Sequence, residues 1–242
     1  PVELMDLAET LNQMLARLED SFRRLSDFSS DIAHELRTPV SNLLTQTQVM
    51  LSRTRTIDEY QDVLASNAEE LERMAKMIAD MLFLAKADND LVMPNLETVD
   101  LRAEAEGLAS YEAVAEGTGV TLTVDGNATV SGDRLMLRRA IGNLLSNAFG
   151  HTPRGGYIRI LIGMSDDRMA TIQVENSGET ISSEHLPRLF DRFYRADPSR
   201  KRHADGVGLG LAITRSIIQA HGGFVSVQSA DGVTAFDLKV PV

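Results

Sequence analysis

The chain has 242 residues, of which 43% are hydrophobic and 24% charged, an ordinary composition for a folded globular protein that argues against disorder. Its net charge of −11 disfavours nucleic acid as a partner, because there is no basic surplus to neutralise phosphates. The absence of cysteine excludes disulfides, thiolate chemistry and cysteine-based zinc sites.

Residues 2–52 predict one nearly continuous helix. Its apolar stripe around the middle has steps of three and four residues and comprises Leu25, Phe28, Ile32, Leu36, Val40 and Leu43. His34 lies two residues from both Ile32 and Leu36, about 200° around the helix from the stripe, so we expect its ring to face solvent. Pro39 has no N–H for the carbonyl of Glu35, which predicts a kinked or loosened helix beside the histidine.

A second helix is predicted from residue 57 onwards. Thr56 and Glu59 have the spacing of a capping box, and the apolar residues after them alternate steps of three and four as far as Ala85. Asn67 interrupts this stripe, as polar residues that fix the register of paired helices do. We therefore expect an antiparallel hairpin, and because each stripe is too wide for one partner helix, a dimeric four-helix bundle.

The beginning of the chain falls inside a helical pattern, which we interpret as part of a longer protein. The sequence contains neither an apolar run long enough to span a membrane nor a signal peptide.

The pattern changes after a predicted linker at residues 88–98. Helices are expected at 102–116, 133–149 and 208–220, and strands at 120–125, 157–164, 169–175, 224–229 and 234–240. Hairpin connections are expected at Ser165–Arg168 and at Asp231–Gly232. These elements predict helices layered on a mixed sheet, an α/β sandwich, for residues 97–242. The long polar stretch 191–207 is typical of a lid or a binding loop.

Two segments of this second half have residue types that suit a phosphate or metal site. Asn143 and Asn147 lie one turn apart on a helix, either as a polar helix edge or as oxygen ligands for Mg²⁺. Gly206, Gly208 and Gly210 precede an amphipathic run, so N–H groups at a helix N-terminus are available for phosphate. Because a charged stretch and not a strand comes before the glycines, a Rossmann dinucleotide site is disfavoured.

Two more segments are ambiguous when taken singly. Residues 175–178 (Glu-Asn-Ser-Gly) have the character of an ordinary transition from strand to turn. Residues 189–195 mix aromatic side chains, which usually enter the core, with arginines that can reach a phosphoryl group. The order of all four segments, downstream of a displayed histidine on a dimeric hairpin, is the informative feature.

That order resembles the sensor histidine kinases of two-component systems over almost the entire chain. The resemblance lies in the H box at 28–44, the N box at 138–153, the G1 box at 174–181, the F box at 187–195 and the G2 box at 205–212. Residues 188–200 resemble the copper/silver heavy-metal sensor branch in detail.

The resemblance implies an α+β fold in three parts. Residues 1–22 would be the end of a HAMP-type signalling helix. Residues 23–88 would be the dimerisation and histidine phosphotransfer hairpin, and residues 97–242 a catalytic ATP-binding domain, an α/β sandwich of the GHKL type.

The resemblance also implies a protein-histidine kinase that uses ATP and Mg²⁺. His34 would be the phosphoacceptor, and Glu35 would accept a hydrogen bond from its other ring nitrogen. Thr38 with Glu35 resembles the family's phosphatase motif. Asn143 matches a supporting catalytic position, and Asn147 matches the position that binds Mg²⁺ and the nucleotide. The other implied nucleotide-binding residues are Asn176, Gly178, Arg192, Gly206, Gly208, Leu209 and Gly210.

The implied partners are a second copy of the chain and the receiver domain of a response regulator, without nucleic acid. Membrane contact is expected only through segments absent from this chain, which would be the cytoplasmic portion of an inner-membrane sensor protein. The expected function is autophosphorylation of His34, transfer to a regulator aspartate and phosphatase activity toward the phosphorylated regulator, in metal-responsive signalling. The alternative is a nucleotide-gated interaction module that acts mainly as a regulator phosphatase with weak autokinase activity.

Two positions depart from the family's pattern. Asn176 stands where an aspartate usually accepts a hydrogen bond from the adenine amino group, which predicts weaker nucleotide affinity. Gly150 stands where a basic residue is usual, so Mg²⁺ and other cations must meet the phosphate charge. The candidate cations are Arg192, Arg195, Arg200, Lys201 and Arg202.

Overall fold

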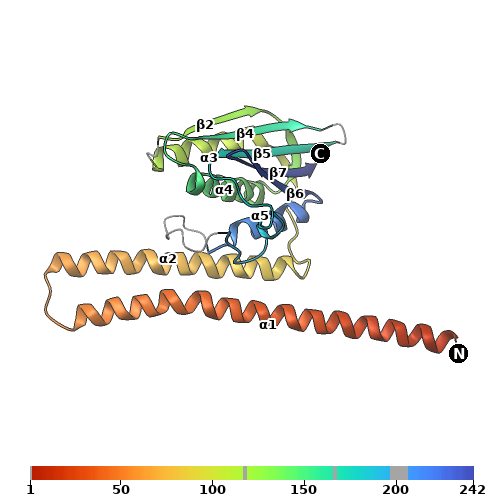
Figure 1. Ribbon diagram of the computed structural model, residues 1–242, viewed down its shortest axis with the longest axis horizontal. Coiled ribbons are helices and arrows are strands. Elements are labelled where there is room, and N and C mark those ends of the chain that lie inside the picture. The colour runs from red at the N-terminus through yellow and green to blue at the C-terminus, as the bar shows by residue number, and fades with distance from the viewer. Residues whose placement is uncertain (1, 117–118, 166–167, 197–206) are drawn as a thin grey trace. The chain divides into compact units, whose positions relative to one another are not determined.

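The computed structural model describes residues 2–116, 119–165, 168–196 and 207–242, and the chain divides into two compact units, Pro1–Ala75 and Lys76–Val242. The first unit confirms the long helix, α1 (Val2–Leu51), which includes Pro39. Helix α2 (Ile57–Ala87) runs antiparallel to α1 after a short turn, and its last part belongs to the second unit (Figure 1). Among the described helices, none has the length and apolar composition needed to cross a bilayer.

The predicted capping box starts α2. The N–H of Thr56 donates to Oε2 of Glu59 at 2.9 Å, and the N–H of Glu59 donates to Oγ1 of Thr56 at 3.2 Å. The Thr56 N–H holds the pKa of Glu59 below its ordinary value. These reciprocal bonds satisfy two helix-end donors and fix the point at which the hairpin turns back.

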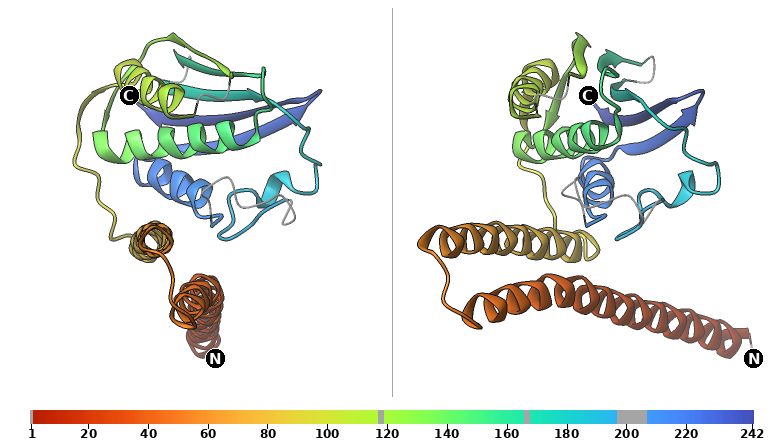
Figure 2. Two further views of the ribbon diagram at one scale, coloured as in Figure 1. Left: turned by 90° about the vertical axis from the view of Figure 1, so that its left-hand side faces the viewer. Right: turned by 60° about the vertical axis from the view of Figure 1, so that its left-hand side comes forward.

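The second unit contains a five-stranded mixed sheet with helices on one face (Figure 2). In spatial order the strands are β2 (Thr121–Gly126), β4 (Tyr157–Met164), β5 (Met169–Ser177), β7 (Val233–Pro241) and β6 (Phe224–Ala230). Among these described strands, β2 and β4 are the only parallel neighbours. The helices are α3 (Leu101–Glu116), α4 (Arg134–His151) and α5 (Gly210–Ala220). This arrangement confirms the α/β sandwich.

Alternate residues of the central strands form the core beneath the helices. The buried set in β5 and β7 is Ala170, Ile172, Val174, Asn176, Thr234, Phe236, Leu238 and Val240. Asn176 and Thr234 are its polar members, and they lie opposite each other in the β5–β7 pairing. The apolar layer therefore ends in a buried polar pair at one end of these strands.

Two short strands were missing from the sequence prediction. Strands β1 (Glu97–Asp100) and β3 (Thr129–Gly132) form a separate antiparallel sheet, in which Val99 and Val130 are paired and buried. The prediction had placed residues 97 and 98 in the linker. Strands of four residues are too short to show a periodicity, and their pairing depends on a partner that is distant in the sequence. A short 3₁₀ helix, η1 (Leu186–Arg188), was also not predicted.

Candidate functional site

His34 lies on α1 with its side chain exposed to solvent, as its position opposite the apolar stripe predicts. Glu35 is half-buried, and Thr38, one turn further on, is exposed. The side chain of Pro39 is buried, and α1 continues past it to Leu51. The helix thus displays a nucleophilic imidazole with an acid beside it and a hydroxyl one turn away on the same face.

Helix α4, which carries Asn143 and Asn147, begins at an N-cap made by Asp133. The Asp133 carboxylate accepts the N–H of Met136 at 3.0 Å and, through its other oxygen, the N–H of Asn95 at 3.0 Å. Burial alone would raise the pKa of Asp133, but these N–H donors outweigh it and hold the pKa below its ordinary value. The cap therefore fixes the end of the linker to the start of α4.

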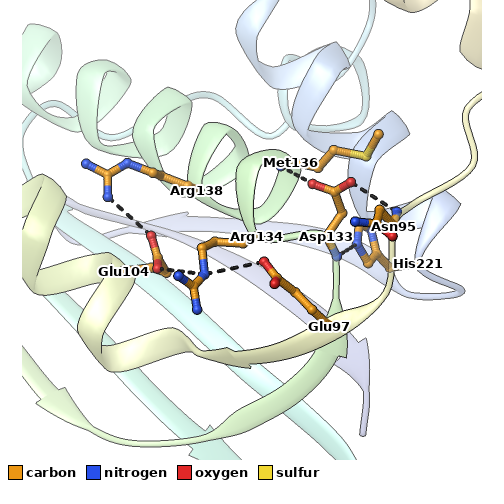
Figure 3. A network of polar contacts seen from close by, with 8 residues as sticks. All are labelled: Asn95, Glu97, Glu104, Asp133, Arg134, Met136, Arg138 and His221. Atoms are coloured by element: carbon orange, nitrogen blue, oxygen red, sulfur yellow. Dashed lines mark hydrogen bonds and ion pairs between the residues drawn. The ribbon is translucent and has the colours of Figure 1, made fainter.

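His221 ties α5 to the same point (Figure 3). Its Nε2 accepts the N–H of Asp133 at 2.9 Å, and its Nδ1 is 2.8 Å from the carbonyl oxygen of Ile217. Because a backbone N–H only donates and a carbonyl only accepts, this geometry selects the neutral ring with its proton on Nδ1. Sequence reasoning missed both Asp133 and His221. A cap residue before a periodic helix is a signal that identifies Asp133, whereas nothing local pairs it with His221.

Ion pairs brace the first turns of α4 from the other side (Figure 3). Arg134 lies 3.5 Å from Glu97 of β1 and 3.5 Å from Glu104 of α3, and Arg138 lies 3.2 Å from Glu104. The start of α4 is therefore connected to β1, α3 and α5, so α4 is a fixed platform for its asparagines.

Asn143 and Asn147 are both half-buried. Nδ2 of Asn143 donates to the carbonyl of Gly210 at 3.1 Å, which joins α4 to the first residue of α5. Leu209, the N-cap residue of α5, is 2% exposed and anchors this helix start in the core. Asn147, one turn beyond Asn143, has the type of oxygen that Mg²⁺ binds.

Gly208 permits a close approach between two backbone segments. Its φ is +77°, and a Cβ there would lie 2.8 Å from the carbonyl carbon of Phe193. The N–H of Phe193 donates to the Gly208 carbonyl at 3.0 Å. Only glycine suits both this conformation and this contact. Gly206, the other predicted glycine of this segment, lies outside the described residues.

The turn after β5 is held by the tip of the β6–β7 hairpin. The N–H of Gly178 donates to the Gly232 carbonyl at 2.8 Å, and the N–H of Gly232 donates to Oγ1 of Thr180 at 2.8 Å. Asn176, which is 4% exposed, donates its Nδ2 to the Ser177 carbonyl at 3.2 Å. This orientation leaves the amide oxygen as the acceptor atom of the Asn176 side chain.

An open depression of about 450 Å³ lies where this turn meets the end of α4. Its lining residues are Gly150, His151, Thr152, Pro153, Gly178 and Glu179. A Cβ on Gly178 would lie 2.8 Å from the His151 carbonyl oxygen, so a larger residue would not fit in this wall. Of the predicted nucleotide-binding residues, Gly178 lines this depression, whereas Asn147, Asn176, Gly208, Leu209 and Gly210 are not among its lining residues.

In the segment after η1, the aromatic side chain of Phe190 lies in the core and Arg192 forms an ion pair. Phe190 is 7% exposed and packs edge-on against Phe236 with the ring centres 6.1 Å apart, which confirms that this aromatic folds inward. Arg192 pairs with Asp88, just beyond the end of α2. The predicted phosphate cations Arg200, Lys201 and Arg202 lie outside the described residues.

Comparison with known proteins gives matches over both halves of the chain. Residues 24–90 match the His Kinase A (phospho-acceptor) domain, and residues 132–242 match the histidine kinase-, DNA gyrase B- and HSP90-like ATPase. The chain is 51% identical over 243 residues to the sensor histidine kinase CusS of Escherichia coli strain K12, and this match covers 100% of the chain and 50% of CusS. The chain thus spans about half the length of the curated relatives it matches.

Solved structures agree in fold. The histidine kinase AdeS of Acinetobacter baumannii has a TM-score of 0.70 at 22% identity, over 86% of this chain and 97% of AdeS. The histidine kinase ThkA in complex with the response regulator protein TrrA has a TM-score of 0.71 at 20% identity, over 90% of this chain and 63% of that chain. With a phospho-acceptor domain, an ATPase domain and a relative of this identity, the chain belongs to the sensor histidine kinases of two-component systems.

Proposed function

We propose that this chain uses magnesium-bound ATP to phosphorylate His34 and then passes the phosphoryl group to an aspartate of a response regulator. One observation carries the proposal: the exposed His34 stands beside Glu35 on a helix, in a chain whose residues 132–242 match the histidine kinase-, DNA gyrase B- and HSP90-like ATPase. A buried imidazole would have no access to a phosphoryl donor.

Each of the proposed site residues has a separate role in the phosphoryl transfer. When bound, ATP supplies the phosphoryl group and Mg²⁺ neutralises part of its charge. Asn147 would hold the metal through its amide oxygen, Asn176 would accept a hydrogen bond from the adenine amino group, and N–H groups of the 208–210 segment would bind phosphate oxygens. His34 supplies a ring nitrogen as nucleophile. Glu35 would accept the other ring N–H, which holds the reactive tautomer and stabilises the imidazolium.

We also propose that two copies of the chain pair through their hairpins. Along α2, large apolar side chains recur every seven residues and are 44–75% exposed: Ile57, Leu64, Leu71 and Ile78. Asn67 lies between them, with its Nδ2 3.5 Å from Oγ1 of Thr47 and its buried Oδ1 without a partner among the described residues. A second hairpin would cover the stripe and complete a four-helix bundle.

A response regulator is the proposed second partner, because the exposed His34 is accessible to another protein. Thr38, exposed and one turn from His34, is the hydroxyl that would orient a water for dephosphorylation of the regulator. Metal-responsive signalling, with this chain as the cytoplasmic portion of a longer membrane sensor, is proposed from the resemblance of residues 188–200 to the copper/silver branch.

Incubation with γ-labelled ATP and Mg²⁺ tests the kinase activity. We expect label that is labile in acid and stable in base, present in the unaltered chain and lost in His34→Ala. Asn42→Ala, an exposed change two turns further along α1, is the control and should keep the label. Label that persists in His34→Ala, or label that is stable in acid, would contradict the assignment of His34.

Two observations favour the second candidate function, a module that mainly dephosphorylates its regulator. The pairing of Arg192 with Asp88 and the neutral side chain of Asn176 both weaken the expected affinity for nucleotide. Weak labelling of His34, together with nucleotide-stimulated regulator dephosphorylation that Thr38→Ala abolishes, would select this candidate.

A further inference from the structure

The last turns of α2 lie in the same compact unit as the nucleotide-binding residues, and they contact α4 through Arg139. Arg139 pairs with Asp80, and its guanidinium carbon lies 4.8 Å from the centre of the Phe83 ring. Asp80 and Phe83 are three residues apart, so they share one helix face. One arginine therefore holds this face by an ion pair and by a cation–π contact.

Asp88 extends the same contact past the end of α2. Its N–H donates to the Leu84 carbonyl at 3.0 Å, which continues the helical pattern beyond Ala87, and its carboxylate pairs with Arg192. Leu84, four residues after Asp80 and four before Asp88, is fully buried. The edge of α2 from residue 80 to residue 88 is thus held at both of its ends by arginines of the nucleotide-binding domain.

Arg192 also adjoins the glycine segment at the start of α5. The next residue, Phe193, donates its N–H to the Gly208 carbonyl at 3.0 Å, and its backbone is too close to Gly208 for any Cβ. Asn143 reaches the same segment through the Gly210 carbonyl at 3.1 Å. Arg192 is therefore the neighbour in sequence of a residue that contacts the proposed phosphate-binding segment through its backbone, while its own guanidinium is paired with Asp88.

We infer that Asp88 and the phosphate groups of a nucleotide compete for the guanidinium of Arg192, so that docking of the end of α2 and phosphate binding oppose each other. This inference rests on the proposed nucleotide-binding function. Asp88 accepts from Nη2 of Arg192, and a phosphate oxygen that takes this same donor displaces the carboxylate. By linkage, release of Asp88 strengthens phosphate binding, and bound phosphate favours release of Asp88.

The expected coupling is modest because the pair is partly exposed, with 25% of the Arg192 side chain and 50% of the Asp88 side chain accessible. Ion pairs of this kind correspond to about a two- to fivefold change in a binding constant. The contacts of Arg139 with Asp80 and Phe83 do not involve Arg192, so they keep the last turns of α2 against α4 when the Asp88–Arg192 pair dissociates.

Calorimetric titration of the whole chain with Mg·AMP-PNP, and separately with adenosine, tests the inference. Asp88→Asn removes the carboxylate charge with little change of shape, and we expect it to tighten Mg·AMP-PNP binding by about two- to fivefold and leave adenosine binding unchanged. Asp90→Asn is the matched control, since it makes the same change of charge at an exposed position two residues further on and should leave both affinities unchanged. In an Arg192→Gln background, Asp88→Asn should have no further effect.

Unchanged Mg·AMP-PNP affinity in Asp88→Asn would overturn the inference while leaving the proposed function intact. So would a gain that also appears with adenosine, with Asp90→Asn or in the Arg192→Gln background. If the unaltered chain binds neither Mg·AMP-PNP nor adenosine, the proposed function and the inference are both overturned.

Discussion

Replacement of Asn176 by aspartate tests how the adenine base is held. Asn176 is 4% exposed and lies opposite Thr234, at the point where the buried layer of β5 and β7 becomes polar. Its amide oxygen is the expected acceptor for the adenine amino group. An aspartate of the same shape would accept that hydrogen bond with a charge.

The magnitude follows from the two kinds of hydrogen bond. A neutral hydrogen bond contributes about 1 kcal/mol and one to a charged group about 1.5–3 kcal/mol. The expected gain is therefore about 1 kcal/mol, or about fivefold tighter nucleotide binding. The free protein should lose stability, because a carboxylate at position 176 gives up most of its hydration. We expect its free energy of unfolding to fall by about 1–2 kcal/mol.

Calorimetry with Mg·ADP and with Mg·IDP separates base recognition from general effects, because inosine has a carbonyl in place of the amino group. Asn176→Asp should bind Mg·ADP more tightly and Mg·IDP more weakly than the unaltered chain, since a carboxylate has no proton to donate to that carbonyl. Asn127→Asp, the same chemical change at an exposed position, should alter neither affinity. Equal affinities of the unaltered chain and the Asn176→Asp variant for Mg·ADP would refute the reasoning.

Three further outcomes are expected. Gly208→Ala and Gly155→Ala both place a side chain at positive φ (+77° and +82°), but of these two Cβ atoms only the one at 208 would clash with backbone. Gly208→Ala should therefore weaken Mg·ADP binding by more than about tenfold in calorimetry, and Gly155→Ala should not. Equal losses of affinity in the two variants would contradict this expectation. Leu71→Glu should give monomers in sedimentation velocity, because a two-fold interface contains this leucine from both copies and the change removes about 3–6 kcal/mol of dimerisation free energy. Ser66→Glu is the control: it lies about 140° around the helix from Leu71 and should leave the dimer intact. Asp133→Ala should lower the free energy of unfolding by about 1–2 kcal/mol at pH 7. The pKa of Asp133 in the folded chain lies below its ordinary value of 3.8, so the difference in free energy of unfolding between the unaltered chain and the variant is complete above pH 3.8 and vanishes as the pH falls through the folded pKa. Urea titrations at several pH values measure it, and a difference that does not change with pH would contradict the role of Asp133 as a charged N-cap.

The regular elements were predictable because their signals are local. The apolar stripe around His34 and the alternation along 157–164 each repeat along a whole helix or strand. The capping box at Thr56 involves residues only three positions apart. The solvent-facing position of His34 followed from the same periodicity. These features depend on which face of an element is apolar, and the sequence carries that information directly.

The contacts that complete the site were not predictable. Asp133 meets His221 across 88 residues, and Arg192 meets Asp88 across 104 residues. Such pairs form because the packing of whole helices and strands brings the two side chains together. The sequence around a charged or imidazole side chain contains no pattern that shows whether it has a distant partner. The role of Arg192 shows the consequence, because its chemistry suits phosphate while its partner in the structure is a carboxylate.

The bond between Asn95 and Asp133 sets the length of a tether. Asn95 is fixed to the start of α4 and lies seven residues beyond Asp88, so the chain between them reaches at most about 25 Å when fully extended. A tether of this length would hold the end of α2 near the start of α4 at an effective concentration in the millimolar range. At that effective concentration, weak contacts such as the Arg192–Asp88 pair would suffice to favour the docked arrangement in the equilibrium inferred above.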